Sequence, residues 1–155
     1  MSANELVPGQ ADLDRILTMI PHRYPMLLVD KVIEIVAGES AHGIKNVTIN
    51  EPQFQGHFPS QAVMPGVYTI ESMAQTAAVL AVHTMGPEAE GKLVYFLGID
   101  KARFRRPIVP GDVMHIHVQK IRGRGAIWKF SGNVLVDDEL AADAEFSAMM
   151  RDAGA

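Results

Sequence analysis

The sequence contains no cysteine, no excess of basic residues and no uninterrupted apolar segment of membrane-spanning length. Without cysteine the chain can form neither disulfide bonds nor a thiolate metal site, which fits a reducing compartment. The formal net charge of −4 argues against a general nucleic-acid-binding protein. Residues 1–10 are polar and include Glu5, so they lack the basic and apolar segments of a secretory signal. We therefore expect a cytoplasmic protein with no nucleic acid or membrane among its partners.

The length of 155 residues suits a single domain. A chain of this size buries about 70% of its unfolded surface, which is enough for a substantial core. Hydrophobic residues (48%) and charged residues (21%) occur in the proportions of an ordinary globular protein. We predict one domain over residues 1–155, in which residues 1–10 form a flexible tail.

Residues 66–85 form the longest apolar segment of the chain. Pro65 suits the first position of a helix, the segment contains no further proline or glycine after Gly66, and Gly86 and Pro87 end it. A helix of this length is roughly 30 Å long. Because the segment is apolar on most sides, the sequence predicts the buried central helix of the domain.

Most of the remaining chain shows the patterns of β-strands. In residues 113–121 and 126–136 apolar side chains alternate with other residues, and turns follow at residues 123–125 and 137–138. Two successive hairpins of this kind predict an antiparallel meander, and with the long helix they indicate the α+β class. The predicted elements are a helix over residues 11–20 and strands over residues 26–36, 41–49, 93–99, 102–104, 113–121, 126–136 and 140–150.

Glu71 is the only side chain between Gly66 and Thr84 that is ionised near neutral pH, apart from a possible charge on His83. It shares a helix face with small apolar residues. A carboxylate on such a face is costly unless it is paired or takes up a proton, and a protonated carboxyl group can serve as a general acid. The alternatives are an ion pair with an arginine from elsewhere in the chain, or a helix edge that faces water.

His57 lies in the loop that leads to this helix. A histidine in a loop is most often simply solvated, but the neighbouring helix start offers backbone N–H groups that have no partner within the helix. Gly66 has no side chain, so a substrate atom could approach its backbone closely. The loop and the helix could together supply a base, an acid and a hydrogen-bond donor for an oxyanion.

Three sequence blocks identify a known family: Gly56-His57-Phe58-Pro59, Val63-Met64-Pro65-Gly66-Val67 and Glu71-Ser72-Met73-Ala74-Gln75. They closely resemble the (3R)-3-hydroxyacyl-acyl-carrier-protein dehydratases of bacterial fatty-acid synthesis, the FabZ type. The segments at residues 21–30, 96–104 and 107–112 resemble the same family, so that the likeness extends over roughly residues 15–150. The resemblance implies the hot-dog fold, in which an antiparallel sheet wraps the long helix.

The resemblance also implies a mechanism. Neutral His57 would take the C2 proton of the 3-hydroxyacyl thioester, and protonated Glu71 would donate to the leaving C3 hydroxyl. The N–H of Gly66 would bind the thioester oxygen, and neither a cofactor nor a metal would be needed. The related enzymes that also isomerise the double bond have Asp at the position of Glu71, so we expect dehydration without isomerisation.

Further residues are assigned to the substrate and its carrier by the same resemblance. We expect the acyl substrate to contact Gly66, Val67, Phe58, Tyr95 and Phe96; the last two would gate an acyl tunnel or else belong to the core. The partner is the acidic acyl carrier protein, whose phosphopantetheine arm carries the acyl chain. It would dock on Lys101, Arg103, Arg105 and Arg106, for which a solvated or salt-bridged edge strand is the alternative.

The family further implies a homo-oligomer. Its dimer would share active sites, with His57 from one subunit and Glu71 from the other, and the dimers would assemble as a trimer. The competing functions are a hot-dog thioesterase, in which a helix acid activates water, and a non-catalytic module that binds the acyl carrier. His115 and His117 share one strand face and could bind a metal, but no third ligand is evident and a solvated face is the alternative.

Overall fold

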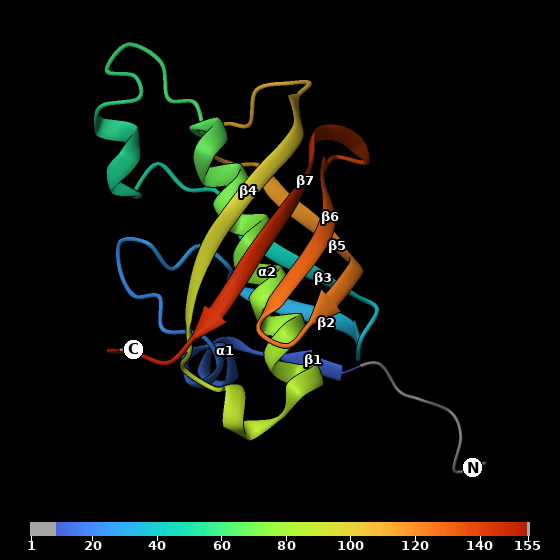
Figure 1. Cartoon of the computed structure of the whole chain (residues 1–155). Helices are drawn as coiled ribbons and strands as arrows, with labels where there is room; N and C mark the ends of the chain where they lie inside the picture. The colour runs from blue at the N-terminus through green and yellow to red at the C-terminus, as the bar shows by residue number, and fades with distance from the viewer. Residues whose placement is uncertain (1–8, 155) are drawn as a thin grey trace, which may run out of the picture.

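The computed structural model describes residues 9–154. Helix α2 (Gly66–Met85) lies at its centre, and a seven-stranded antiparallel sheet curves around this helix (Figure 1). Every residue from Thr69 to Val82 is buried, except Glu71. The predicted central helix and the α+β hot-dog arrangement are confirmed, although Pro65 is the N-cap rather than the first helical residue. Among the described residues no helix has the length and hydrophobicity to cross a membrane.

The strands follow the order β1-β2-β3-β5-β6-β7-β4, and each neighbouring pair is antiparallel. The short helix α1 contacts α2 at the end of the sheet where the chain begins (Figure 1). The elements are β1 (Gly9–Ala11), α1 (Leu13–Met19), β2 (Lys31–Val36), β3 (Ser40–Asn46), a 3₁₀ helix (Pro52–Gln55), α2, a second 3₁₀ helix (Pro87–Ala89), β4 (Leu93–Phe104), β5 (Val113–Arg124), β6 (Ile127–Val136) and β7 (Glu139–Arg151).

The N-terminal part differs from the prediction in two places. Gly9 and Gln10 belong to β1, which pairs with β2, so these two residues are not part of a tail; the rest of the predicted tail, residues 1–8, lies outside the described residues. The strand predicted over residues 26–36 begins only at Lys31. The reason is that the backbone N–H of Leu28 donates to the Oε1 atom of Gln75 on α2 (2.9 Å) instead of to a strand.

Strands β4 and β5 are longer than the sequence pattern indicated. The two segments predicted at residues 93–99 and 102–104 form the single strand β4, because β7 pairs with it from Leu93 to Phe104. Register shifts occur between Phe96 and Gly98 and between Asp100 and Arg103. Because such irregularities interrupt the alternation of side chains, the sequence pattern indicated two strands instead of one. β5 extends to Arg124, so the following turn begins at Gly125 instead of occupying residues 123–125.

The core lies between α2 and the concave face of the sheet. The alternating apolar side chains of β5, Met114, Ile116 and Val118, are buried, as expected for one face of a half-buried strand. Strands that face the helix carry glycine at close contacts: a Cβ atom on Gly132 would lie only 2.9 Å from the Sδ atom of Met73. The long helix and the strands after it thus form a packed body that holds the start of α2 in a fixed place.

Candidate active site

The His57 imidazole is held by the loop in a defined protonation pattern. Its Nδ1 atom lies 2.7 Å from the carbonyl oxygen of Val63. Since a carbonyl can only accept a hydrogen bond, Nδ1 carries the proton and Nε2 of the neutral ring keeps its lone pair. The ring of Phe58 stacks on the imidazole at a centroid distance of 3.9 Å. The lone pair of Nε2 is therefore available to accept a hydrogen bond or a proton.

Backbone hydrogen bonds fix the loop on both sides of this histidine. The N–H of His57 donates to the carbonyl of Gln53 in the 3₁₀ helix (3.1 Å), and the N–H of Val63 donates to the carbonyl of His57 (3.1 Å). The N–H of Met64 donates to the carbonyl of Ile108 (2.7 Å). The loop is thereby tied to the segment that follows β4, immediately before α2 begins.

Helix α2 starts beside this loop at Gly66. The first N–H groups of a helix have no acceptor within it and carry the positive end of the helix dipole. The structure adds a second reason for glycine here, because a Cβ atom at this position would lie 2.7 Å from the ring carbon Cε1 of Phe104. Gly66 thus permits an aromatic side chain from the end of β4 to cover the helix start.

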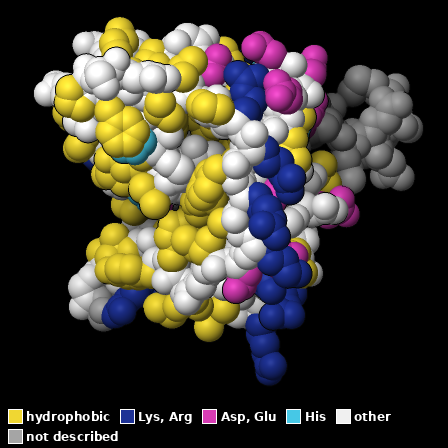
Figure 2. Space-filling view, turned by 90° about the horizontal axis from the view of Figure 1, so that it is seen from above, with side chains coloured by type: hydrophobic (Ala, Val, Ile, Leu, Met, Phe, Trp, Pro, Cys, Tyr) yellow, Lys and Arg dark blue, Asp and Glu magenta, His cyan; other side chains and the backbone are white. Residues whose placement is uncertain are grey.

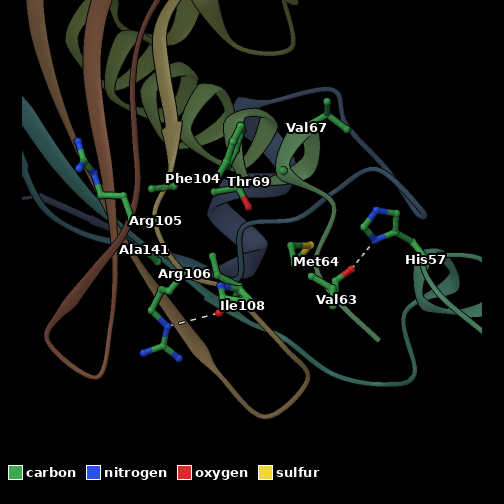
Figure 3. Close-up of a pocket in the computed structure, with 13 residues that line it drawn as sticks. His57, Val63, Met64, Val67, Thr69, Phe104, Arg105, Arg106, Ile108 and Ala141 are labelled. Carbon is green, nitrogen blue, oxygen red and sulfur yellow. Dashed lines mark hydrogen bonds between the residues drawn. The ribbon is translucent and has the colours of Figure 1, made fainter. Parts of the chain in front are cut away.

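A cavity of about 600 Å³ adjoins the helix start (Figure 3). Its lining includes three residues predicted for the catalytic and substrate site: His57, Gly66 and Val67. Val67 is 72% exposed. The opposite wall comes from the end of β4 and the beginning of β7. Figure 3 shows His57 at one side of this cavity and Phe104 at another. The lining is mostly apolar with a histidine at the edge, which suits an acyl chain with a reactive end.

Glu71 does not line the same cavity in the single chain. Its side chain is 20% exposed, and its Oε1 atom lies 3.0 Å from Nε2 of Gln75 and 3.3 Å from Nε2 of His22. Within residues 9–154 the ion-pair partner of Glu71 is a histidine, so the alternative of an arginine partner is wrong for this part of the chain. Sequence reasoning missed the contact with His22.

The remaining predicted substrate residues lie on or near exposed surfaces. Tyr95 and Phe96 on β4 are 48% and 37% exposed, so the alternative that they belong to the core is wrong. Neither side chain lines the cavity. Phe58 does not line it either and is 50% exposed. β4 forms one end of the sheet, and it presents further apolar side chains at Leu97 and Ile99. This strand carries an apolar surface at a sheet edge, which is a site suited to pairing with another chain.

The four predicted docking residues occupy the C-terminal half of β4 and the segment after it. Arg105 and Arg106 line the cavity and form ion pairs with Asp143 (2.7 Å) and Glu139 (3.1 Å). Lys101 lies 3.7 Å from Glu145, and Arg103 is exposed. Lys and Arg side chains form a row beside a largely hydrophobic face in Figure 2. The salt-bridged alternative therefore applies to three of these residues without excluding a docking role.

The histidine pair on β5 is part of a larger cluster. His42 on β3 brings its Nε2 atom to 2.9 Å from Nδ1 of His115, and its ring lies 4.2 Å from that of His117. Nδ1 of His42 is also 3.5 Å from a carboxylate oxygen of Glu34. In the described part of the chain, however, no three such side chains are arranged to hold a metal ion. The cluster lies on the outer face of the sheet, away from His57.

Comparisons with known proteins agree on one family. The model of the FabA-like domain matches residues 20–145. A protein of Rhodospirillum rubrum is 61% identical over 141 residues, which cover 91% of this chain and 88% of that protein. Proteins of Paramagnetospirillum magneticum (62% over 141 residues; 91% and 88% covered) and Gluconobacter oxydans (60% over 144 residues; 93% and 85% covered) are equally similar. All three are named 3-hydroxyacyl-(acyl-carrier-protein) dehydratase FabZ.

A solved structure shares the fold at much lower identity. It is the dehydratase heterocomplex ApeI:P from Xenorhabdus doucetiae, with a TM-score of 0.73 and 20% sequence identity. The match covers 89% of this chain and 91% of that one. At this level of identity the likeness supports the hot-dog fold alone.

Proposed function

The chain belongs to the FabA-like family, and we propose that His57 and Glu71 carry out its reaction as base and acid. Relatives that are 60 to 62% identical over most of the chain are dehydratases of 3-hydroxyacyl-acyl-carrier-protein. The protein is accordingly a 3-hydroxyacyl-acyl-carrier-protein dehydratase of fatty-acid biosynthesis. The thioesterase and binding-module alternatives lose their support.

The observation that carries the proposal is the hydrogen bond between His57 Nδ1 and the Val63 carbonyl oxygen. It leaves Nε2 unprotonated and directed away from the loop, so that this atom can take the C2 proton of the substrate. A base held in this way contributes roughly 100- to 10,000-fold to the rate. The cavity next to His57 provides the space for the acyl thioester.

Proton transfer to His57 places negative charge on the thioester oxygen. The N–H of Gly66, at the start of α2, is suited to donate to this oxygen, and the helix dipole adds to the stabilisation. Glu71 then gives its proton to the C3 hydroxyl while the C3–O bond breaks. The products are the trans-2-enoyl thioester and one water molecule, and the proton on His57 restores the acid before the next turnover.

We propose that the functional unit is a homodimer. His57 and Glu71 do not line one cavity in a single chain, whereas β4 offers an apolar strand at the edge of the sheet. Antiparallel pairing of two β4 strands would cover this edge and follow the symmetry of a closed dimer. Tyr95 and Phe96 would then lie at the boundary between the subunits, where they could contact the acyl chain. The trimer of dimers and the cytoplasmic location stay predictions.

The acyl carrier protein would approach from the side of the predicted docking residues. Arg105 and Arg106 lie at the cavity itself, and Arg103 is exposed close by on β4. Acidic carboxylates already neutralise part of this charge. We therefore expect these residues to affect the association rate more than the chemical step.

Mass spectrometry of a 3-hydroxyacyl carrier thioester after incubation with the protein tests the reaction. We expect the loss of one water with the acyl group still attached to its carrier. Release of free carrier and free acid would instead indicate a thioesterase. The variants His57→Ala and His57→Gln should both lose activity by about 100-fold or more, since neither offers a basic nitrogen. Unchanged turnover in either variant would refute the role of His57.

A further inference from the structure

Two side chains approach the same oxygen of Glu71. Gln75 Nε2 lies 3.0 Å from Oε1, and His22 Nε2 lies 3.3 Å from it. We propose that His22 is a positioning residue, which holds Oε1 with its Nε2–H group so that Oε2 faces the leaving hydroxyl of the substrate. The proposal rests on the acid role given to Glu71 above.

The orientation of the Gln75 amide is set by backbone groups. The N–H of Leu28 can only donate, and it reaches Oε1 of Gln75 at 2.9 Å. The amide nitrogen of Gln75 therefore points the other way, where it donates to the carbonyl of Met26 at 2.7 Å and to Glu71. Both hydrogens of this amide are used, and Glu71 Oε1 must act as the acceptor.

The proposal requires one arrangement of protons around this carboxyl group. Protonated Glu71 carries its proton on Oε2, so that Oε1 acts only as an acceptor. Nε2 of His22 then carries a proton and is placed to donate to Oε1, which lies 3.3 Å away. An unprotonated Nε2 would instead bring a second lone pair against Oε1. After Glu71 has given up its proton, the same two donors stabilise the carboxylate, as donors to charged acceptors do.

The segment that contains His22 is anchored on both sides. The guanidinium of Arg23 donates to the carbonyl of His22 itself (2.7 Å) and to those of Leu17 (2.7 Å) and Ile20 (3.0 Å) at the end of α1. Downstream, Gln75 binds the backbone at residues 26 and 28. The imidazole is thus held beside the second turn of α2, next to Glu71, by contacts that do not involve its own nitrogens.

The burial of His22 argues against a purely space-filling role. Its side chain is 15% exposed, and Nδ1 is buried without a hydrogen-bond partner among residues 9–154. An apolar side chain of similar size would fill this space without enclosing an unpartnered polar atom. The contact of Nε2 with Glu71 supplies a reason for histidine that packing does not.

Three variants test the proposal. The amide nitrogen of glutamine lies about as far from the backbone as Nε2 of histidine, whereas that of asparagine lies about as far as Nδ1. Phenylalanine offers no hydrogen-bond donor. We expect His22→Gln to keep most of the activity of the wild-type enzyme. In His22→Asn and His22→Phe kcat should fall by up to about 100-fold while KM changes little, because misplacement of the acid affects the chemical step.

The control measurements are the midpoint of thermal unfolding and the activity of Glu71→Gln. Equal kcat for the wild type, His22→Asn and His22→Phe would overturn the positioning role, and so would an equal loss in all three variants, His22→Gln included. A rise in KM in all three variants, with kcat unchanged, would also overturn the positioning role. If Glu71→Gln is fully active, the acid assignment itself has failed. If Glu71→Gln is inactive and His22→Asn is not, only the role of His22 has failed.

Discussion

The ammonium group of Lys45 lies 2.6 Å from Oε1 of Glu51, and this ion pair joins β3 to the segment that carries His57. The two side chains are only 5% and 15% exposed. Glu51 also accepts from the N–H of Thr48 (2.9 Å) and from the amide of Gln53 (3.1 Å). Because the carbonyl of Gln53 accepts from the N–H of His57, the ion pair is linked to His57 through a single intermediate residue.

Substitution Lys45→Met should therefore destabilise the protein and lower its activity together. The change leaves the Glu51 carboxylate largely buried without its cation, which costs about 3 kcal/mol. Urea denaturation measures this loss as a lower midpoint. The double variant Lys45→Met/Glu51→Gln removes both charges and should recover part of the stability. A Lys45→Met protein as stable as the wild type would show that the ion pair does not anchor this segment.

Substitution Gly66→Ala tests the contact between the helix start and β4. A methyl group there would lie 2.7 Å from the Phe104 ring, so the ring or the helix start has to move. We expect kcat/KM to fall by up to about 100-fold, because the N–H proposed to bind the thioester oxygen shifts with the helix start. Dehydration of a 3-hydroxyacyl thioester measures the effect.

The second-site variant Gly66→Ala/Phe104→Leu serves as the control. Leucine is smaller than phenylalanine and lacks the ring carbons that the new methyl group would meet. The double variant should regain part of the lost activity, while Phe104→Leu alone changes it less than Gly66→Ala does. Identical activities of Gly66→Ala and the double variant would mean that the ring contact is not the cause of the loss.

Much of the fold follows from local patterns in the sequence. The bounds of α2 were predictable because Pro65, Gly86 and Pro87 end an apolar segment at both sides. The alternation in β5 and β6 was equally informative, since each strand has one buried face. The bulges in β4 and the irregular segment before β2 were not, because they depend on pairing with β7 and on a hydrogen bond to Gln75.

The site was predictable in its parts but not in its arrangement. The motifs identified His57, Gly66 and Glu71, and the structure brings the first two to one cavity. The contact of His22 with Glu71 joins residues 49 positions apart, which no local pattern encodes. The addition of His42 to the histidines on β5 likewise arises from strand pairing.

The cluster around His117 predicts an acid-sensitive stability. Burial lowers the pKa of His117 below its ordinary value of 6.5; the nearby His42 lowers it next, Glu34 raises it and His115 lowers it again. The unfolded chain therefore binds more protons than the folded one as the pH falls below about 6.5. The contribution of this residue to stability is present above that pH and is lost as the pH falls towards the lowered folded-state pKa.

Thermal unfolding between pH 8 and pH 5 checks this sign. We expect the unfolding temperature of the wild type to fall as the pH drops below about 6.5, and to fall less steeply in His117→Gln. The variant His83→Gln, which removes an exposed histidine outside this cluster, provides the comparison. A steeper slope in His117→Gln than in the wild type would contradict the direction of the shift.

Mixed dimers decide whether two subunits share one active site. In a dimer of one His57→Ala and one Glu71→Gln subunit, a shared arrangement rebuilds one intact site and leaves the other without both groups. Random exchange of equal amounts should then restore about 25% of the wild-type activity, since half of the dimers are mixed and each has one working site. A site contained within one subunit would give no recovery. Native mass spectrometry of the mixture verifies the exchange, so that an absence of activity in proven mixed dimers would refute the shared site.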